Sequence, residues 1–335
     1  TVDSCQFEYM GAQAFGAYRI TNLTFQNNTI DQCLQTGIYV QDVTSPYINV
    51  DILNNTVTNI GLLFGQGSFW QNPDYSAIGV SAFTGLRVMY NTVTNAGDAG
   101  IKWGGNIAQV AYNIVGYVCL LTADRGNIYN FVDIDAYSTH FRRLIHNNFC
   151  YNAFGNLQGT PQEFSSSPTI RAIGIYLDGR NDGDSVFNNT IWNTPGGAFS
   201  FNIDTNVVCY GNLIVITDSS SRYGKALGLR VQQLRNYPVR FFEFTNNFVF
   251  ASLSTQKQFQ YTAASQSPAS IIANFKAIGT INNNFYNLPT IANYQTEAGT
   301  PYGLGNYNHS QYTAQFGFGI TDTLMPNYPL KQCLF

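Results

Sequence analysis

A short segment centred on asparagine recurs nine times along this chain of 335 residues. The nine copies read FQNNTI, ILNNTV, VMYNTV, VAYNIV, LIHNNF, VFNNTI, CYGNLI, FTNNFV and TINNNF. Their shared asparagines are Asn28, Asn55, Asn91, Asn113, Asn148, Asn189, Asn212, Asn247 and Asn284. The spacing between neighbours ranges from 22 residues (Asn91 to Asn113) to 41 residues (Asn148 to Asn189). A minimum period of about 22 residues, lengthened in places by insertions, is typical of a solenoid.

Each anchor asparagine follows a short run of alternating apolar residues and precedes another, which places it at a bend between two strands. Asparagine tolerates the left-handed backbone conformation and hydrogen-bonds neighbouring backbone groups, so it suits such a bend. When coils stack, the side-chain amides come into line and can form a ladder. A β-sandwich or jelly roll also has many short strands, but it does not repeat one residue at one bend in this way.

We therefore predict an all-β fold, a right-handed parallel β-helix (a solenoid) of about nine to eleven coils with inserted loops. Residues 1–290 form the β-helix in this prediction. The repeat fades beyond residue 290. Residues 291–335 are therefore expected to form a C-terminal cap that hides the open strand edges of the last coil.

A second set of segments also aligns between coils, and GIYVQD, GIKWGG and GIYLDG are examples. Because side chains alternate between the two faces of a strand, the alignment assigns each position to the core or to the outside. The residues predicted to point inward are Ile38, Val40, Ile78, Val80, Ile101, Ile128, Ile175, Leu177, Leu227 and Leu229. The residues predicted to point outward are Tyr39, Gln41, Ser81, Lys102, Tyr129, Phe131, Tyr176, Asp178, Phe199, Phe201 and Arg230.

The outward set would form an aromatic row along one flank of the solenoid, and exposed apolar surface of this kind needs a cover or a ligand. Insertions at 61–76, 155–172 and 252–278 would either cover this flank or form the walls of a binding groove beside it. The first insertion carries Trp70.

The composition narrows the choice of partner. Charged residues make up only 10% of the chain, against about 25% in typical soluble proteins. The surface must therefore be built from uncharged polar and aromatic side chains, which suit the hydroxyls and the C–H faces of sugars. A net charge of −3 without a Lys/Arg footprint argues against a nucleic-acid partner. No apolar run is long enough to predict a membrane span.

Two aspartates precede glycine in segments of similar form, Asp98-Ala-Gly-Ile and Asp124-Arg-Gly-Asn-Ile. Stacked on neighbouring coils, their backbones would lie about 5 Å apart. Paired carboxylates push their pKa values apart and so provide one acid and one base or nucleophile, and a separation of about 5 Å favours a retaining glycosidase. The alternatives are that the two carboxylates bind Ca²⁺, or that each aspartate only caps a turn. No other cofactor or metal site is predicted.

Asp178 points outward in GIYLDG and is the third candidate catalytic carboxylate. The candidate substrate-binding residues are Lys102, Tyr129, Tyr176, Trp70 and Arg230. Lys102 and Tyr129 beside Arg125 would also suit a polysaccharide lyase, in which a base removes a proton next to a uronate carboxylate. A groove for polyuronates should be richer in Lys and Arg than this chain, so a glycoside hydrolase is favoured over a lyase.

Over residues 20–290 the repeat resembles the right-handed parallel β-helix proteins of the pectate-lyase-like superfamily. Within it, DRGNIYNF (124–131), GIYLDG (174–179) and VFNNTIWNTPGGAF (186–199) are similar to a stretch of bacterial β-helix glycoside hydrolases. There the first two segments commonly run Asp-Gly-Gly-x-Ile-Tyr and Gly-Ile-Tyr-Leu-Asp-Asp. The resemblance implies extracellular work on polysaccharides and points to Asp124 and Asp178. This chain departs from the pattern at Arg125, where the family has Gly, and at Gly179, where it often has Asp.

Together these features predict a secreted or cell-surface protein whose partner is a polysaccharide. It would cleave a neutral or weakly acidic polysaccharide in a groove on one flank of the β-helix, using paired carboxylates. The alternative is a non-catalytic polysaccharide-binding adhesin or a structural surface module, because the low charge and many aromatic residues are similar to those of β-helix surface adhesins. Further domains of a larger surface protein are expected in either case.

Overall fold

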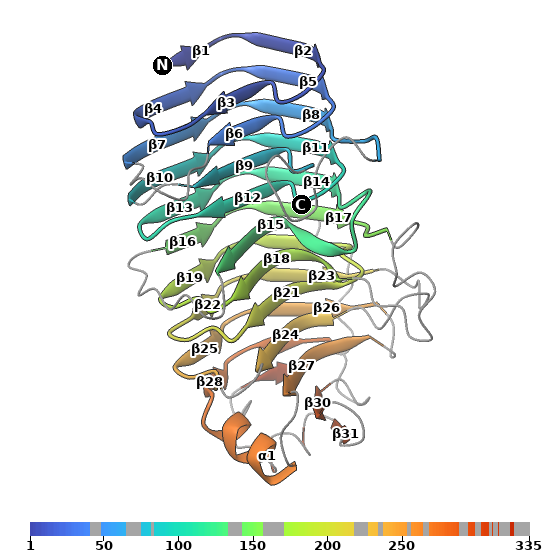
Figure 1. Cartoon of the computed structure of the whole chain (residues 1–335). Helices are drawn as coiled ribbons and strands as arrows, with labels where there is room; N and C mark the ends of the chain where they lie inside the picture. The colour runs from blue at the N-terminus through green and yellow to red at the C-terminus, as the bar shows by residue number, and fades with distance from the viewer. Residues whose placement is uncertain are drawn as a thin grey trace.

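In the computed structural model the chain winds into a β-helix whose three sheets run along its length (Figure 1). The structure describes residues 1–40, 48–64, 75–81, 84–132, 143–156, 171–217, 227–233, 237–252, 256–263, 268–287, 294–298, 303–307, 310, 314 and 322–324. Each coil contributes one strand to each sheet in the order A, B, C. Neighbouring strands are parallel throughout the described residues, apart from the last pair in sheet C. The prediction of a right-handed parallel β-helix is confirmed.

Sheet A consists of β1 (Val2–Asp3), β4 (Thr21–Gln26), β7 (Ile48–Leu53), β10 (Thr84–Met89), β13 (Ala108–Ala111), β16 (Arg143–His146), β19 (Asp184–Phe187), β22 (Val208–Tyr210), β25 (Phe242–Thr245) and β28 (Gly279–Asn282). Sheet B consists of β2 (Gln6–Met10), β5 (Thr29–Cys33), β8 (Thr56–Ile60), β11 (Thr92–Ala96), β14 (Ile114–Val118), β17 (Phe149–Ala153), β20 (Thr190–Trp192), β23 (Leu213–Ile216), β26 (Phe248–Ala251), β29 (Phe285–Tyr286) and β32 (Thr323–Leu324).

Sheet C consists of β3 (Phe15–Ala17), β6 (Ile38–Val40), β9 (Ile78–Ser81), β12 (Ile101–Gly104), β15 (Asp124–Val132), β18 (Arg171–Gly179), β21 (Gly197–Asn202), β24 (Leu227–Gln233), β27 (Lys257–Ala263), β30 (Tyr294–Ala298) and β31 (Gly303–Tyr307). The helix α1 (Pro268–Lys276) lies at the C-terminal end of the stack (Figure 1). It is too short to span a membrane, and no other helix of the described residues is long and apolar enough to do so.

The anchor asparagines form a buried ladder at the corner between sheets A and B. In the middle of the ladder, both the backbone N–H and the side-chain Nδ2 of Asn148 donate to Oδ1 of Asn189, at 3.0 and 2.9 Å. The same pair of bonds joins each anchor to the next from Asn28 to Asn284. The left-handed residue at this corner is the one before the anchor, such as Asn188 with φ +54°, and the anchor itself points into the interior.

Alternation in sheet C places the residues as predicted for most positions. Nine of the ten residues predicted to point inward are buried in the apolar core. The side chain of the tenth, Leu227, lies outside the described residues. Tyr39, Tyr129 and Tyr176 lie on the opposite face of the sheet, but they are also buried, so they do not form an open aromatic strip. Phe131 on that face is 51% exposed. Gln41 lies outside the described residues.

The prediction that Phe199 and Phe201 point outward is wrong. Phe199 and Phe201 are fully buried in the core and lie in register with Ile175 and Leu177 of the preceding strand. The prediction aligned GAFSFN one residue out of register, and a slip of one residue exchanges the two faces of a strand. The observed register turns Ser200 and Asn202 toward the outer face instead.

The stretch 252–278 is not simply an inserted loop, because it contains the sheet strand β27 and the helix α1. Beyond residue 290, β30 still pairs in parallel with β27 and therefore continues sheet C, whereas β31 turns back antiparallel to β30. The division into a β-helix at 1–290 and a cap at 291–335 stays a prediction. Most of the insertions at 61–76 and 155–172, including Trp70, lies outside the described residues.

We expect the ladder to contribute strongly to stability. Replacing Asn189 by alanine removes the acceptor for two donors of Asn148 and leaves both buried. Since each buried unsatisfied group costs about 1–3 kcal/mol, the free energy of unfolding should fall by about 3 kcal/mol, measured by urea denaturation.

The matched control is Asn188→Gly at the neighbouring exposed position, where φ is +54°. Glycine adopts this conformation readily, so the free energy of unfolding should change by less than about 1 kcal/mol. Equal losses in the two variants would contradict a role for the buried ladder.

Candidate functional site

The outer face of sheet C brings together most of the polar residues singled out by the sequence. Lys102, Tyr129, Tyr176, Ser200 and Arg230 are consecutive partners in register on five neighbouring strands, from β12 to β24. Because neighbouring strands lie about 4.8 Å apart, this row is about 19 Å long. Four of the five predicted substrate-binding residues therefore lie in one row.

Asp178 lies beside this row near the end of β18, and its carboxylate accepts hydrogen bonds from the side chains of Asn202, Tyr129 and Tyr176. The Tyr129 hydroxyl donates to Oδ2 at 3.0 Å, and Nδ2 of Asn202 donates to Oδ1 at 2.8 Å. The Asn202 amide also donates to the Tyr176 hydroxyl at 2.9 Å, which ties the three strands β15, β18 and β21 together.

The environment of Asp178 favours its protonated form. Burial raises the pKa of the Asp178 carboxyl above its usual value, and the negative charge of Asp124 raises it further. Hydrogen bonds from Asn202, Tyr129 and Tyr176 oppose this shift without cancelling it. Burial also raises the pKa of Tyr129 well above its usual value, so its hydroxyl remains a donor.

Asp124 begins β15, the strand next to β18, and is partly buried. It is close enough for its charge to act on Asp178. A carboxyl group whose pKa is raised in this way can act as the acid, and a second carboxyl group can act as the base or nucleophile. The candidate carboxyl pair is therefore Asp124 and Asp178. The two residues lie on neighbouring strands but not side by side, because Asp124 pairs in register with Arg171 and Asp178 with Phe131.

Asp98 was predicted to stack on Asp124, and this pairing is wrong. Ile101 lies in register with Ile128, so counting back along the two strands places Asp98 beside Arg125. The Arg125 Nε lies 3.4 Å from Oδ1 of Asp98. Asn127, the additional residue in Asp-Arg-Gly-Asn-Ile, accounts for the shift of one position.

Asp98 is 1% exposed and belongs to a buried turn, where its carboxylate accepts hydrogen bonds from Thr122 at 2.9 Å and Ser76 at 3.4 Å. These contacts give Asp98 a structural role, because its carboxylate joins side chains of the preceding and the following coil. They do not fit a Ca²⁺ site, because the arginine paired with the carboxylate repels a cation. No group of three or more His, Cys, Asp or Glu side chains in the described part of the chain is placed to hold a metal ion.

Arg125 is a cation that packs against one of the two tyrosines. Its guanidinium carbon lies 4.7 Å from the centre of the Tyr129 ring, and Nη1 donates to the backbone carbonyl of Asp124 at 2.8 Å. Together with the ion pair to Asp98, these contacts bury Arg125 almost completely. Arg125 thus orders the turn that carries Asp124 and packs over the donor to Asp178.

Of the other predicted substrate-binding residues, Lys102 is half-buried beside Tyr129, and Arg230 donates to the Gln232 side chain at 2.5 Å. Asn202 was missed by sequence reasoning. The correct register of GAFSFN would have found it, because that register places Asn202 next to Asp178 on the outer face.

Residues 1–115 match the family model of the right-handed β-helix region. The matched part ends within β14, so it includes Lys102 on β12 but not β15, β18 and β21, which carry Tyr129, Asp178 and Asn202. Comparisons with curated proteins and with solved structures gave no match. The family match therefore supports the fold, and the chemistry of the site rests on its own geometry.

The raised pKa of Asp178 makes stability depend on pH. This carboxyl is harder to ionise in the folded chain, so its stabilising contribution is full below the unfolded pKa of about 3.9 and is lost as the pH rises through the folded pKa. Asp178→Asn removes this effect. We expect the stability of the wild type relative to this variant to fall as the pH rises through that window, measured by urea denaturation at a series of pH values. A difference that does not vary with pH would contradict the raised pKa.

Proposed function

We propose that this β-helix is a secreted or cell-surface enzyme that hydrolyses glycosidic bonds of a polysaccharide bound along the outer face of sheet C. Asp178 is the general acid in this proposal, and Asp124 is the second carboxylate. The observation that carries it is the environment of Asp178, a partly buried carboxyl whose pKa is raised by burial and by the charge of Asp124, and which accepts hydrogen bonds from the neutral side chains of Tyr129 and Asn202.

A general acid has to hold its proton until the glycosidic oxygen accepts it. Burial and the charge of Asp124 raise the pKa of Asp178 and so favour the protonated form. After the proton has moved to the leaving oxygen, Tyr129 and Asn202 stabilise the carboxylate that remains. In one route Asp124 accepts a proton from a water molecule that attacks the anomeric carbon while the bond to the leaving oxygen breaks. In the other route Asp124 attacks this carbon itself and forms a glycosyl ester, which water then hydrolyses with the Asp178 carboxylate accepting the proton of the water.

Hydrolysis is favoured over the lyase reaction by the position of Arg125. A lyase needs a cation that binds the uronate carboxylate of the substrate. Arg125 is buried against Tyr129 and paired with Asp98, so its charge is directed into the protein. The remaining cations of the row, Lys102 and Arg230, are compatible with a neutral or weakly acidic polysaccharide.

Phe131 provides an apolar contact for the substrate. It lies in register with Asp178 on the neighbouring strand and is 51% exposed, which is unusual for an aromatic residue at the centre of a sheet. A pyranose ring has an apolar C–H face that packs on aromatic rings. A sugar on Phe131 would therefore place its linkage close to Asp178.

The test of the proposal is to replace Asp178 and Asp124 separately by asparagine. Each change keeps the shape of the side chain and removes its acid–base chemistry. We expect the release of reducing ends from a panel of plant and algal polysaccharides to fall by about 100- to 10,000-fold in each variant.

The control is Asp51→Asn on sheet A, where Asp51 forms a surface ion pair with Arg87, a kind of pair that contributes little to stability. This variant should retain wild-type turnover. Unchanged turnover in both site variants would contradict the assignment. If the wild type releases no reducing ends but is retained by an insoluble polysaccharide, the alternative of a non-catalytic adhesin, which the exposed Phe131 also favours, is the correct one.

Replacing Phe131 by alanine removes the proposed sugar platform but leaves both carboxyl groups in place. We expect KM to rise, or binding to insoluble polysaccharide to weaken, by about tenfold, while kcat changes much less. The exposed Phe241 serves as the control because it directly precedes β25 and therefore lies at sheet A, away from the outer face of sheet C. Equal effects of Phe131→Ala and Phe241→Ala would contradict a specific sugar contact at Phe131.

A further inference from the structure

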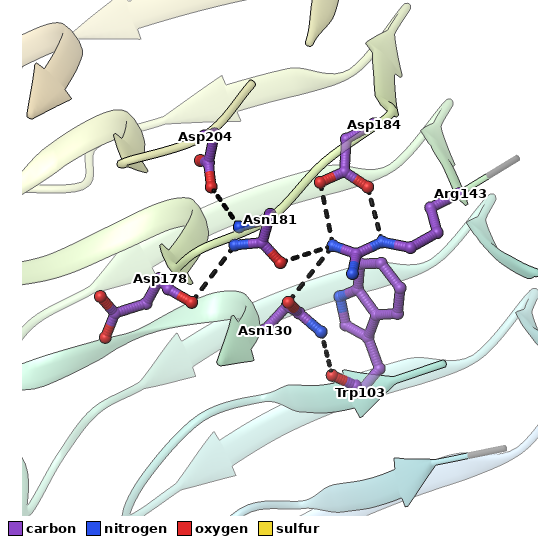
Figure 2. Close-up of polar contacts among 7 residues, drawn as sticks. All are labelled: Trp103, Asn130, Arg143, Asp178, Asn181, Asp184 and Asp204. Atoms are coloured by element: carbon purple, nitrogen blue, oxygen red, sulfur yellow. Dashed lines mark hydrogen bonds and ion pairs between the residues drawn. The ribbon is translucent and has the colours of Figure 1, made fainter. Parts of the chain in front are cut away.

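Behind the candidate site, the interior of the β-helix contains a buried ion pair (Figure 2). Nε of Arg143 lies 2.6 Å from Oδ1 of Asp184, and Nη2 lies 2.9 Å from Oδ2, so the contact is bidentate. Both side chains are 0% exposed. The guanidinium carbon also lies 4.8 Å from the centre of the Trp103 ring. Arg143 and Asp184 are the first residues of β16 and β19, next to the corner between sheets C and A.

The guanidinium also contacts two asparagines that adjoin the candidate site. Its Nη2 donates to Oδ1 of Asn181 at 2.8 Å and to Oδ1 of Asn130 at 3.3 Å (Figure 2). Asn130 directly follows Tyr129 in β15. Asn181 follows β18, and its Nδ2 donates to the backbone carbonyl of Asp178 at 3.2 Å. The Arg143 side chain therefore connects Asn130, which is next to Tyr129, with Asn181, whose amide binds the backbone carbonyl of Asp178.

On the outer face of sheet C, the same two strands, β15 and β18, are joined by the hydrogen bond from the Tyr129 hydroxyl to the Asp178 carboxylate. Directly after Asp178 the backbone turns at Gly179, where φ is +91°. A glycine at this point is conformationally permissive, so the end of β18 needs another constraint if Asp178 is to keep its position. The contacts through Asn181 supply this constraint from inside.

The charges of the network balance. Arg143 and Asp184 neutralise each other, and a second acid, Asp204, accepts a hydrogen bond from the backbone N–H of Asn181 at 3.2 Å. Burial and the charge of Asp184 raise the pKa of Asp204 well above its usual value, which favours its neutral form. Buried ion pairs are often no more stabilising than apolar residues of the same size, and the best-supported reason to retain one is that it specifies a conformation.

We propose that Arg143 is a positioning residue that holds Asp178 against Tyr129 by linking the ends of β15 and β18 from inside the β-helix. The use of this arrangement in catalysis rests on the proposed function. The link itself can be tested without any substrate, because its direct consequence is the Tyr129–Asp178 contact. A failure of the proposal is therefore distinguishable from a failure of the proposed hydrolase activity.

The experiment measures the titration of Asp178 by NMR in the whole chain labelled at aspartate. Tyr129→Phe is the reference variant, because it removes a hydrogen bond that lowers the pKa of Asp178. The test variant combines Arg143→Leu with Asp184→Leu, so that no charge is left unpaired in the interior. We expect the reference variant and the test variant each to raise the pKa of Asp178 by about 0.5 to 1. When the test variant is combined with Tyr129→Phe, the pKa of Asp178 should rise no further than in Tyr129→Phe alone, because both changes remove the same Tyr129–Asp178 contact.

Asn181→Ala is the second test variant, in case the double replacement does not fold. It removes the bond to the Asp178 carbonyl and should shift the titration in the same direction. The control is Ile145→Val, a buried core change on β16 that leaves the network intact and should leave the titration unchanged. A wild-type titration of Asp178 in a folded test variant, or a shift that adds in full to that of Tyr129→Phe, would overturn the proposal.

Discussion

The structure depends above all on the hydrogen bonds between stacked asparagines at the corner of sheets A and B. Each anchor between the first and the last accepts two hydrogen bonds from the anchor before it and donates two to the anchor after it, entirely inside the protein. This arrangement satisfies the side-chain amide and also fixes the register of sheets A and B from coil to coil. The chain can then vary the remainder of each coil, since the distance between anchors ranges from 22 to 41 residues without interrupting the ladder.

Sheet C carries the candidate site and lies away from this corner. Its strands β15 and β18 extend to nine residues each, and their outer faces place Asp178 between Tyr129 and Asn202. The ladder does not reach the far ends of these strands. There the interior contains the ion pair of Arg143 and Asp184 instead, which is connected to both strands through Asn130 and Asn181. The stability of the coil and the geometry of the site therefore have separate polar supports.

The fold was predictable because the anchors recur in sequence with the same neighbours, and stacking is the arrangement that satisfies their amides. The site was only partly predictable. Asp178, Tyr129 and Tyr176 follow from strand alternation, but Phe199 and Phe201 were placed on the wrong face because an alignment by glycine does not fix register to one residue. The same uncertainty caused the wrong pairing of Asp98 with Asp124, where the additional Asn127 shifts the neighbour to Arg125. The contacts of Arg143 depend on the way the coils close, which local sequence does not encode.

The most direct test of the central claim is the titration of Asp178 in the wild-type chain, followed by NMR with and without the replacement Asp124→Asn. If Asp178 is the acid of a carboxyl pair, its apparent pKa lies above the value of about 3.9 found for an unperturbed aspartate. The replacement should then lower it, because one cause of the raised pKa is the charge of Asp124. A pKa at or below the unperturbed value, or one that does not respond to the replacement, would contradict the pairing of the two carboxyl groups.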